Sequence, residues 1–281
     1  MKGKVGDFLP KIKQRLMVRY TIVDCLTGTS ASDMEYLAEK NASKYDVIVA
    51  CGGDGTLHLV VNGVMKSGAN PIVGVLPFGT CNDVAKSLHI PTDLDQALDC
   101  LLRLNTIDYD LMYDGENYGV YALAAGYLTK CSYRTSDKVK KRVGRFAYVL
   151  NGLKSIFKFR SLPMTIVADG VRYHDRFAYC LFVNGEYTGG FRVNKGEDLH
   201  NNKVKMVLIR RKNWFASLCV YARLFIFGIN NIKKSRYVNI CDVNNVTIEN
   251  HSNTSFIFDG EKCKFLKKQI VVNHSIKMIT K

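Results

Sequence analysis

The first hundred residues alternate between apolar runs typical of strands and apolar residues at helical spacing. Two continuous apolar runs, at 46–51 and 72–76, are typical of strands that are buried on both faces of a parallel sheet. The run at 19–25 also has a strand pattern. Helices are expected at 4–16, 32–44, 56–67, 83–88 and 94–103, the second of them opening with a Ser32-x-x-Glu35 capping box. This order predicts a Rossmann-like, three-layer α/β domain with a parallel sheet.

After residue 106 the pattern changes to short alternating strands separated by tight turns. Asp114-Gly115 and Asp169-Gly170 each lie between two strand patterns, which is a strong signal for a β-hairpin. Strand patterns continue at 203–211, 237–249 and 255–265, and helical patterns occur at 137–158 and 213–227. We therefore expect an α/β domain at 1–106 and an antiparallel β-sandwich domain at 107–265. The C-terminal segment at 266–281 is expected to pack back on the first domain.

A glycine-rich loop follows the first buried run and precedes a helix. Its residues are Gly52, Gly53, Asp54, Gly55 and Thr56. Glycines let a backbone approach phosphate oxygens closely, and the N-terminus of the next helix offers free N–H groups. An ordinary strand-to-helix turn is the alternative, but such a turn commonly needs one glycine rather than three. The loop matches neither GxxxxGK[ST] nor GxGxxG, so the sequence does not support those two nucleotide-binding classes.

A second loop of similar composition follows the next buried run, with the sequence LPFGTCND at 76–83. Ligands of parallel sheets bind at the carboxyl ends of the strands, so Gly79 and Thr80 are expected to face the same crevice as the first loop. Alone, this segment is equally typical of a helix N-terminus capped by Asn82 or Asp83. Its spacing from the first loop favours the phosphate-binding interpretation.

The charge of the chain is strongly asymmetric. The 40 Lys and Arg against 25 Asp and Glu give a net charge of +15, yet residues 1–106 carry 11 basic and 11 acidic side chains. The whole excess therefore lies in the second domain and predicts an anionic partner. No nucleic-acid-binding module is recognisable, so nucleic acid is not expected as that partner.

Two stretches of the second domain, 137–160 and 210–234, interleave basic side chains with aromatic and aliphatic ones. Each one alone is typical of a packed helix with a basic edge, but the two together favour an anionic membrane surface. The chain shows neither a signal-peptide core nor an apolar run of the ~18 residues that a spanning helix needs. A cytoplasmic protein attached peripherally to the inner face of the membrane is expected.

Together, the two loops resemble those of the diacylglycerol kinase catalytic domain family, in particular its bacterial lipid kinase branch. The resemblance continues in the family's order through GRFAY at 144–148, NGEYTGG at 184–190 and DGE at 259–261. It implies transfer of the γ-phosphoryl group of ATP, with Mg²⁺, to a lipid hydroxyl. Diacylglycerol is the expected acceptor and phosphatidic acid the expected product.

The resemblance also implies roles for particular residues. The nucleotide phosphates would lie against the first loop and against Gly79, Thr80, Asn82 and Asp83, with Thr27 as a further nucleotide contact. Glu261 corresponds to the family's general base, and Asp54 and Asp259 are the other candidate catalytic residues. These are the candidate site residues: Thr27, Gly52, Gly53, Asp54, Gly55, Thr56, Gly79, Thr80, Asn82, Asp83, Asp259 and Glu261.

The three letters DGE are not specific by themselves. Asp114-Gly115-Glu116 has the same letters in a predicted hairpin, so without the resemblance Asp259-Gly260-Glu261 would be interpreted as a type I′ turn. His58, on the helix after the glycine loop, is interpreted as a packing or surface residue.

The sequence departs from the family pattern at two places. Family members begin with a strand and an Asn-Pro-x-x-Gly loop, whereas this sequence begins at Met1 after the equivalent of that loop, which predicts a first domain without its first strand. Asn201 stands where the family carries an Asp that binds a structural Mg²⁺. Because an amide oxygen is an uncharged, weaker ligand, the site is expected to be weakened or lost, with Asp198 as the nearest replacement.

Two other functions are compatible with these residues. NAD kinases share a GGDGT loop, although the second loop and the basic-aromatic stretches favour a lipid acceptor. A degenerate member that binds nucleotide or membrane without turnover would be consistent with Asn201 and the absent first strand. Exposed strand edges are compatible with a homodimer.

Overall fold

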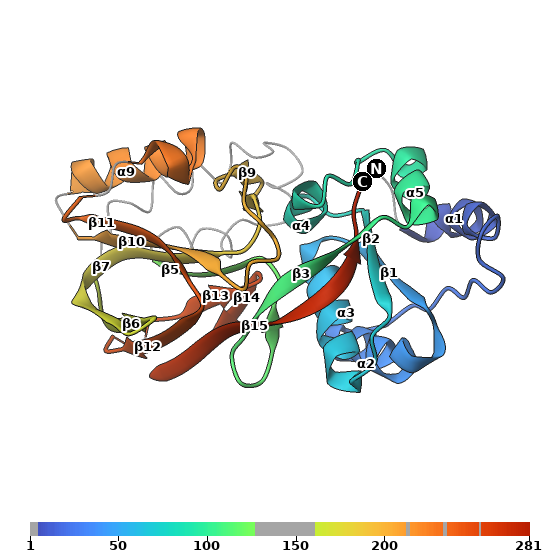
Figure 1. The fold of residues 1–281 in the computed structure, drawn as a ribbon, viewed down its shortest axis with the longest axis horizontal. Coiled ribbons are helices and arrows are strands. Elements are labelled where there is room, and N and C mark those ends of the chain that lie inside the picture. The colour runs from blue at the N-terminus through green and yellow to red at the C-terminus, as the bar shows by residue number, and fades with distance from the viewer. Residues whose placement is uncertain (1–4, 127–160, 212–213, 233–234, 253) are drawn as a thin grey trace.

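The computed structural model describes residues 5–126, 161–211, 214–232, 235–252 and 254–281. Figure 1 shows two lobes that are joined by two long neighbouring strands, β3 (Thr106–Tyr113) and β15 (Lys267–Ile279). β15 pairs antiparallel with β3, from Val271 opposite Tyr113 to Ile279 opposite Thr106. The last strand of the chain therefore runs from the second lobe into the first.

The first lobe is an α/β unit built around two parallel strands. Its elements are η1 (Val5–Phe8), α1 (Leu9–Leu16), α2 (Ala31–Asn41), η2 (Ala42–Lys44), β1 (Val47–Gly52), α3 (Asp54–Ser67), β2 (Ile72–Pro77), α4 (Asp83–Ser87) and α5 (Leu94–Arg103). β1 and β2 pair in parallel from Val47–Ile72 to Gly52–Pro77. β15 continues the sheet beside β2, with Met278 opposite Val73. Both loops that follow β1 and β2 consequently leave the sheet at one edge.

Helices cover both faces of this sheet. α3 packs on β1 with α2 outside it, and α5 packs on β2 with α1 outside it (Figure 1). α2 and α3 approach each other closely because Gly63 has no side chain: a Cβ there would lie 2.3 Å from the carbonyl oxygen of Glu35. Buried Leu57, Val61 and Leu101 belong to the resulting core.

The second lobe is almost entirely antiparallel β. Its elements are β4 (Tyr118–Gly119), β5 (Ala122–Gly126), β6 (Leu162–Ala168), β7 (Val171–Val183), β8 (Tyr187–Thr188), β9 (Phe191–Arg192), β10 (Val204–Arg210), α9 (Trp214–Phe227), η3 (Ile229–Asn231), β11 (Val238–Val243), β12 (Asn245–Asn250), β13 (Phe256–Phe258) and β14 (Glu261–Cys263). The strands follow the order β15-β12-β6-β7-β5-β13-β14, and β10 pairs with β7 and β11. The sheet curves around a core that includes Phe177, Phe182 and Phe256. The predicted architecture of an α/β lobe followed by an antiparallel β lobe is confirmed.

The predicted hairpins are present, but they differ in turn length. Asp169-Gly170 and Asp259-Gly260 are two-residue turns whose φ values are all positive, as a type I′ turn requires. The Asp114 turn instead closes a four-residue loop, with Tyr113 opposite Tyr118. Within this loop, the Asp114 carboxylate accepts the N–H groups of Glu116 and Asn117.

Two predictions about the N-terminal region are wrong. Residues 19–25 do not form a strand, since they have no neighbouring strand among the described residues, and Ile22 is 69% exposed. The cap of α2 is Ser30 rather than Ser32, because the Ser30 hydroxyl accepts the N–H of Asp33 at 3.1 Å. The predicted helix at 137–158 and the GRFAY segment lie outside the described residues, whereas α9 matches the prediction at 213–227. Within the described residues, every helix is too short or too polar to cross a membrane.

Candidate active site

The two glycine loops touch each other at the carboxyl ends of β1 and β2. A Cβ on Gly79 would lie 2.4 Å from the Cα of Gly53, and a Cβ on Gly53 would lie 3.0 Å from the Cα of Gly79. The N–H of Phe78 donates to the carbonyl of Gly52 at 2.9 Å, which fixes the second loop beside the first. Glycine is therefore required at both contact positions, and the two loops form one continuous backbone surface.

Replacing Gly79 by alanine should force the loops apart. We expect the Gly79→Ala variant to lose about 2–3 kcal/mol of unfolding free energy, the usual cost of inserting a methyl group where packing leaves no space. The Gly55→Ala variant is the matched control, because a Cβ at Gly55 meets nothing within 4 Å. Thermal unfolding of both variants measures the difference. Equal unfolding temperatures for the two variants would contradict the contact.

The first loop leads directly into α3. Gly53 is the N-cap of α3, and its carbonyl accepts the N–H of Leu57 at 3.0 Å. The N–H groups of the first helical turn have no partner within the helix, which makes this end favourable for an anion. The Thr56 side chain covers Gly52 so closely that a Cβ on that glycine would lie 2.3 Å from Thr56 Oγ1. A hydroxyl and several amides thus face the mouth of the loop.

Asn82 shapes the second loop from inside. Its backbone is left-handed, with φ 52°, and its Nδ2 donates to the carbonyls of Pro77 at 3.2 Å and Gly79 at 2.9 Å. It is the N-cap of α4 by position, but its side chain holds the loop instead of capping the helix. The cap comes from the first loop, because Asp54 Oδ1 accepts the N–H of Val84 at 3.1 Å. Asp54 therefore ties the two loops together.

Asp83 joins the second loop to the second lobe. Its Oδ1 accepts the N–H of Gly190 at 2.9 Å, and the hydroxyl of Ser87, one turn later on α4, accepts the N–H of Glu186 at 3.1 Å. The NGEYTGG segment of the second lobe is thereby held against α4. Burial, together with the neighbouring Asp54 carboxylate, raises the pKa of Asp83 to about 7.

Because of this raised pKa, the free energy of unfolding should depend on pH. The folded chain keeps a proton on Asp83 that the unfolded chain releases, so this residue lowers stability as the pH rises from about 4 to about 7. The Asp83→Asn variant keeps an acceptor for Gly190 without the charge. We expect it to gain about 4 kcal/mol over wild type near pH 8 and little near pH 4. Thermal unfolding at both pH values, with the exposed Asp46→Asn variant as control, tests this; an equal gain at both pH values would contradict it.

The DGE turn lies between β13 and β14, and its two acids have different surroundings. The Asp259 side chain is 0% exposed. Its Oδ1 accepts the N–H groups of Tyr121 and Ala122 at 2.9 Å each, and its Oδ2 accepts the N–H of Val120 and lies 2.9 Å from Nδ1 of His58. Glu261, two residues later, is exposed. Asp259 is thus placed to hold the turn, and Glu261 is free to meet a substrate.

The DGE turn contacts the helix that begins at the glycine loop. α3 begins at the loop, and one turn along it His58 contacts Asp259. The Glu261 carboxylate is close enough to contribute to raising the pKa of His58. The structure therefore brings together Gly52–Thr56, the second loop and the DGE turn. Asp54 also lies among them, as a link between the loops.

Three other predicted residues belong to other segments of the chain. Thr27 is exposed in the segment before α2. Asn201 Oδ1 accepts the N–H of Lys203 at 2.9 Å, and Asp198 Oδ1 accepts the N–H of His200 at 3.0 Å, so both side chains are used within their own turn. Among the described residues, no three His, Cys, Asp or Glu side chains gather as a metal site would require. The region around Asn201 does not fit a structural Mg²⁺.

A buried carboxylate that the sequence did not single out occupies this region instead. Asp110, on β3, is completely buried, and its Oδ2 accepts the N–H groups of Asn201 and Asn202. Nδ1 of His200 lies 3.4 Å from its other oxygen. Backbone amides and a histidine thus surround the charge. Asp110 lies within the strand-like run at 107–113, and nothing in the sequence distinguishes it there.

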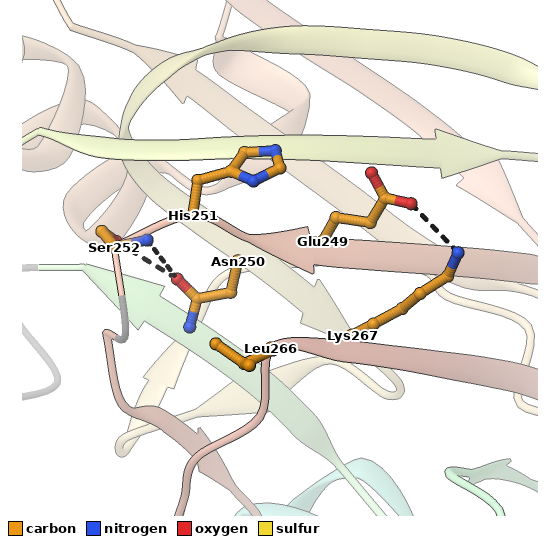
Figure 2. A pocket seen from close by; sticks show the side chains of 6 residues that line it. All are labelled: Glu249, Asn250, His251, Ser252, Leu266 and Lys267. Atoms are coloured by element: carbon orange, nitrogen blue, oxygen red, sulfur yellow. Dashed lines mark hydrogen bonds and ion pairs between the residues drawn. The ribbon is translucent and has the colours of Figure 1, made fainter.

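A shallow hollow at the far end of the second lobe is separate from these loops. It is lined by Glu249, Asn250, His251, Ser252, Leu266 and Lys267, with an ion pair of 3.1 Å between Glu249 and Lys267 (Figure 2). It lies at the opposite end of β15 from the first lobe (Figure 1). It contains none of the predicted site residues.

Comparison with known proteins agrees with the resemblance seen in the loops. Residues 2–113 match the family described as diacylglycerol kinase catalytic domain. Proteins named diacylglycerol kinase from Staphylococcus aureus strains JH9 and Newman are each 32% identical over 170 residues, which are 60% of this chain and 54% of each relative. The chain thus spans about half the length of these curated relatives. The resemblance to this family is confirmed, and it is carried by the part that contains both glycine loops.

Solved structures extend the likeness of fold to the whole chain. The crystal structure of a diacylglycerol kinase from Bacillus anthracis str. Sterne has a TM-score of 0.77 at 19% identity, covering 100% of this chain and 93% of that one. A second structure from the same organism has a TM-score of 0.82 at 20% identity, covering 99% and 91%. At these identities the comparison shows the two-lobed fold.

Proposed function

We propose that this chain is an ATP-dependent lipid kinase that transfers a phosphoryl group to a lipid hydroxyl, with diacylglycerol as the acceptor and phosphatidic acid as the product. The observation that carries the proposal is the contact between the two glycine loops beside a turn that presents an exposed glutamate. The match to the catalytic domain family and the named relatives support the same reaction class.

The loops fit the phosphates of a nucleotide. The backbone of Gly53, Gly55 and Gly79, the amides at the start of α3 and the hydroxyl of Thr56 would hold them. The Oδ1 of Asn82, buried and without a hydrogen-bond partner in the described structure, is a further polar group at this surface. When bound, ATP supplies the γ-phosphoryl group. We expect Mg²⁺ to arrive with ATP, where it would neutralise negative charge on the phosphates.

Glu261 acts as the general base in this proposal. Its carboxylate accepts the proton of the lipid hydroxyl while the hydroxyl oxygen forms its bond to phosphorus and the bond to the leaving ADP breaks. The proton then passes from Glu261 to solvent. Buried Asp259 keeps the turn in place through backbone amides and His58, without contacting the substrate. Positioning and charge neutralisation supply most of the rate enhancement, as in phosphoryl transfer generally.

We propose that the second lobe meets an anionic membrane surface on the cytoplasmic side. α9 exposes Ile226 at 70% and Phe227 at 61%, beside the exposed Arg223. Apolar side chains flanked by cations are typical of helices at the membrane interface. Binding to vesicles should rise with their acidic lipid content and fall with salt. Equal binding to neutral vesicles would contradict this orientation.

An acceptor panel tests the proposed function. Purified chain is incubated with γ-labelled ATP and, in separate reactions, with diacylglycerol, phosphatidylglycerol, undecaprenol, sphingosine or NAD. Label in a lipid product supports a lipid kinase, and the acceptor used best identifies the substrate. Label in NADP would show a dinucleotide kinase instead. Binding of ATP without transfer to any acceptor would show a non-catalytic member of the family.

A further inference from the structure

His58 connects the glycine loop to the DGE turn. It lies on α3, one turn after the loop, and is 9% exposed. Its Nδ1 lies 2.9 Å from Asp259 Oδ2, across the junction between the lobes. The sequence alone gave it no role, because a single histidine on a helix is usually a packing residue. The contact with a buried carboxylate changes that interpretation.

Asn62, one helical turn after His58, also links α3 to the second lobe. Its Oδ1 accepts the N–H of Tyr118 at 2.8 Å, and its Nδ2 donates to the carbonyl of Tyr118 at 2.8 Å and to that of His58 at 2.9 Å. Tyr118 lies on β4, shortly before the amides that bind Asp259. One face of α3 is therefore hydrogen-bonded to both β4 and the DGE turn.

The four partners of Asp259 come from two sources. Three are the backbone amides of Val120, Tyr121 and Ala122, which belong to the second lobe. Among the described residues, His58 is the partner that the first lobe contributes. Without His58, the DGE turn would keep its place within the second lobe but would lose this direct link to α3 and hence to the glycine loop.

We propose that His58 is a positioning residue that sets the distance between the glycine loop and Glu261. It acts through Asp259: α3 begins at the nucleotide loop, His58 fixes Asp259 relative to α3, and Glu261 follows Asp259 by two residues. This proposal rests on the proposed function, since it assigns Glu261 as the base. The link joins a helix of the first lobe to a turn of the second, so we expect it to affect the relative position of the two.

The charge state of His58 should matter as well. Burial lowers the pKa of His58. The hydrogen bond and the negative charge of Asp259 raise this pKa, and Glu261 on β14 and Glu35 on α2 add smaller contributions. The net result is a pKa above the usual value for histidine. Below that pKa the imidazolium and Asp259 form an ion pair. As the pH rises above the pKa of His58, the imidazole becomes neutral but keeps an N–H donor. The interaction between His58 and Asp259 should then weaken without being lost. Asn62 is the uncharged polar neighbour on the same helix.

Two substitutions separate the donor from the charge. The His58→Leu variant removes the hydrogen-bond donor while filling space, and the His58→Asn variant keeps a donor near the position of Nδ1 but cannot ionise. In the lipid kinase assay we expect His58→Leu to lower kcat by about 10- to 100-fold, the loss typical of a misplaced catalytic group, with KM for ATP little changed. His58→Asn should recover most of kcat and lose the part of the pH profile that reports His58. His89→Asn, at an exposed position outside the site, is the matched control and should behave like wild type.

A second measurement does not depend on catalysis. Hydrogen exchange of the amides at 120–122 and 256–263 reports how firmly the DGE turn is held. We expect faster exchange there in His58→Leu than in wild type or His58→Asn. If wild type transfers no phosphate to lipid but this pattern of exchange is seen, the proposed kinase function fails while the link through His58 stands. Unchanged exchange in His58→Leu, or equal loss of kcat in both His58 variants with a raised KM for ATP, would overturn the positioning role.

Discussion

The Glu261→Gln variant should lose phosphoryl transfer to lipid by about 10²- to 10⁴-fold, the range that a general base contributes. Its affinity for ATP should remain unchanged, because the glycine loops do not involve this side chain. The substitution keeps the shape of the side chain and removes only its ability to accept a proton. Glu261 is exposed at the start of β14, so the fold should also be unaffected.

The sequence contains a matched control for this variant. Glu116 belongs to a turn with the same three letters, is exposed, and lies in the hairpin between β3 and β4. The Glu116→Gln variant should retain wild-type turnover. If Glu261→Gln also turned over at the wild-type rate, the assignment of the base would be wrong. Binding of a fluorescent ATP analogue measures the nucleotide site independently of turnover.

The Asp259→Ala variant should be the most destabilising of the substitutions considered. It leaves the amides of Val120, Tyr121 and Ala122, and the imidazole of His58, without their buried acceptor. Removing one partner from such a buried charged network typically costs about 3–5 kcal/mol. The left-handed backbone at this position, with φ 46°, adds to the cost for alanine. Chemical denaturation measures the loss directly.

Asp114 is the control for this second prediction. Its carboxylate also accepts two backbone N–H groups, but these belong to its own surface loop. The Asp114→Ala variant should therefore lose only about 1–2 kcal/mol, from these local hydrogen bonds and from the ion pair of Asp114 with Lys268. Asp259→Asn, which suits the turn and keeps one acceptor oxygen, should fall between the two. Equal losses for Asp114→Ala and Asp259→Ala would contradict the structural role of Asp259.

The sequence predicted that the two glycine loops lie together because their geometry depends on local residues. Three glycines after a buried strand require a close approach, and the parallel order of β1 and β2 places the second loop at the same edge. The close contact between Gly53 and Gly79 agrees with that expectation. Strand patterns and Asp-Gly turns similarly indicated the β lobe, since each depends on neighbouring residues.

The features that the sequence could not predict depend on partners far along the chain. The run at 19–25 has a strand composition, but a strand also needs a neighbour to pair with, and the described structure provides none. Asp114 and Asp259 occur in identical three-letter motifs, and only the packing of β4, β5 and α3 around Asp259 distinguishes them. His58 and Asp110 gave no signal for the same reason, because their partners come from other elements.

The charge asymmetry of the sequence separates the two lobes. The neutral first 106 residues contain both glycine loops, which offer amides and a helix N-terminus rather than cationic side chains. The +15 excess belongs to the residues that follow them in the sequence, among which Ile226 and Phe227 of α9 are exposed apolar side chains. This division agrees with the proposal of a nucleotide site in the first lobe and a membrane-facing surface on the second.

The fate of the γ-phosphoryl group tests the central claim most directly. The chain is incubated with γ-labelled ATP in one reaction that contains both vesicles carrying diacylglycerol and soluble NAD, and the products are separated. We predict label in phosphatidic acid, and about 10²- to 10⁴-fold slower labelling when Glu261→Gln replaces the wild-type chain. Label in NADP, or label released only as inorganic phosphate, would contradict it.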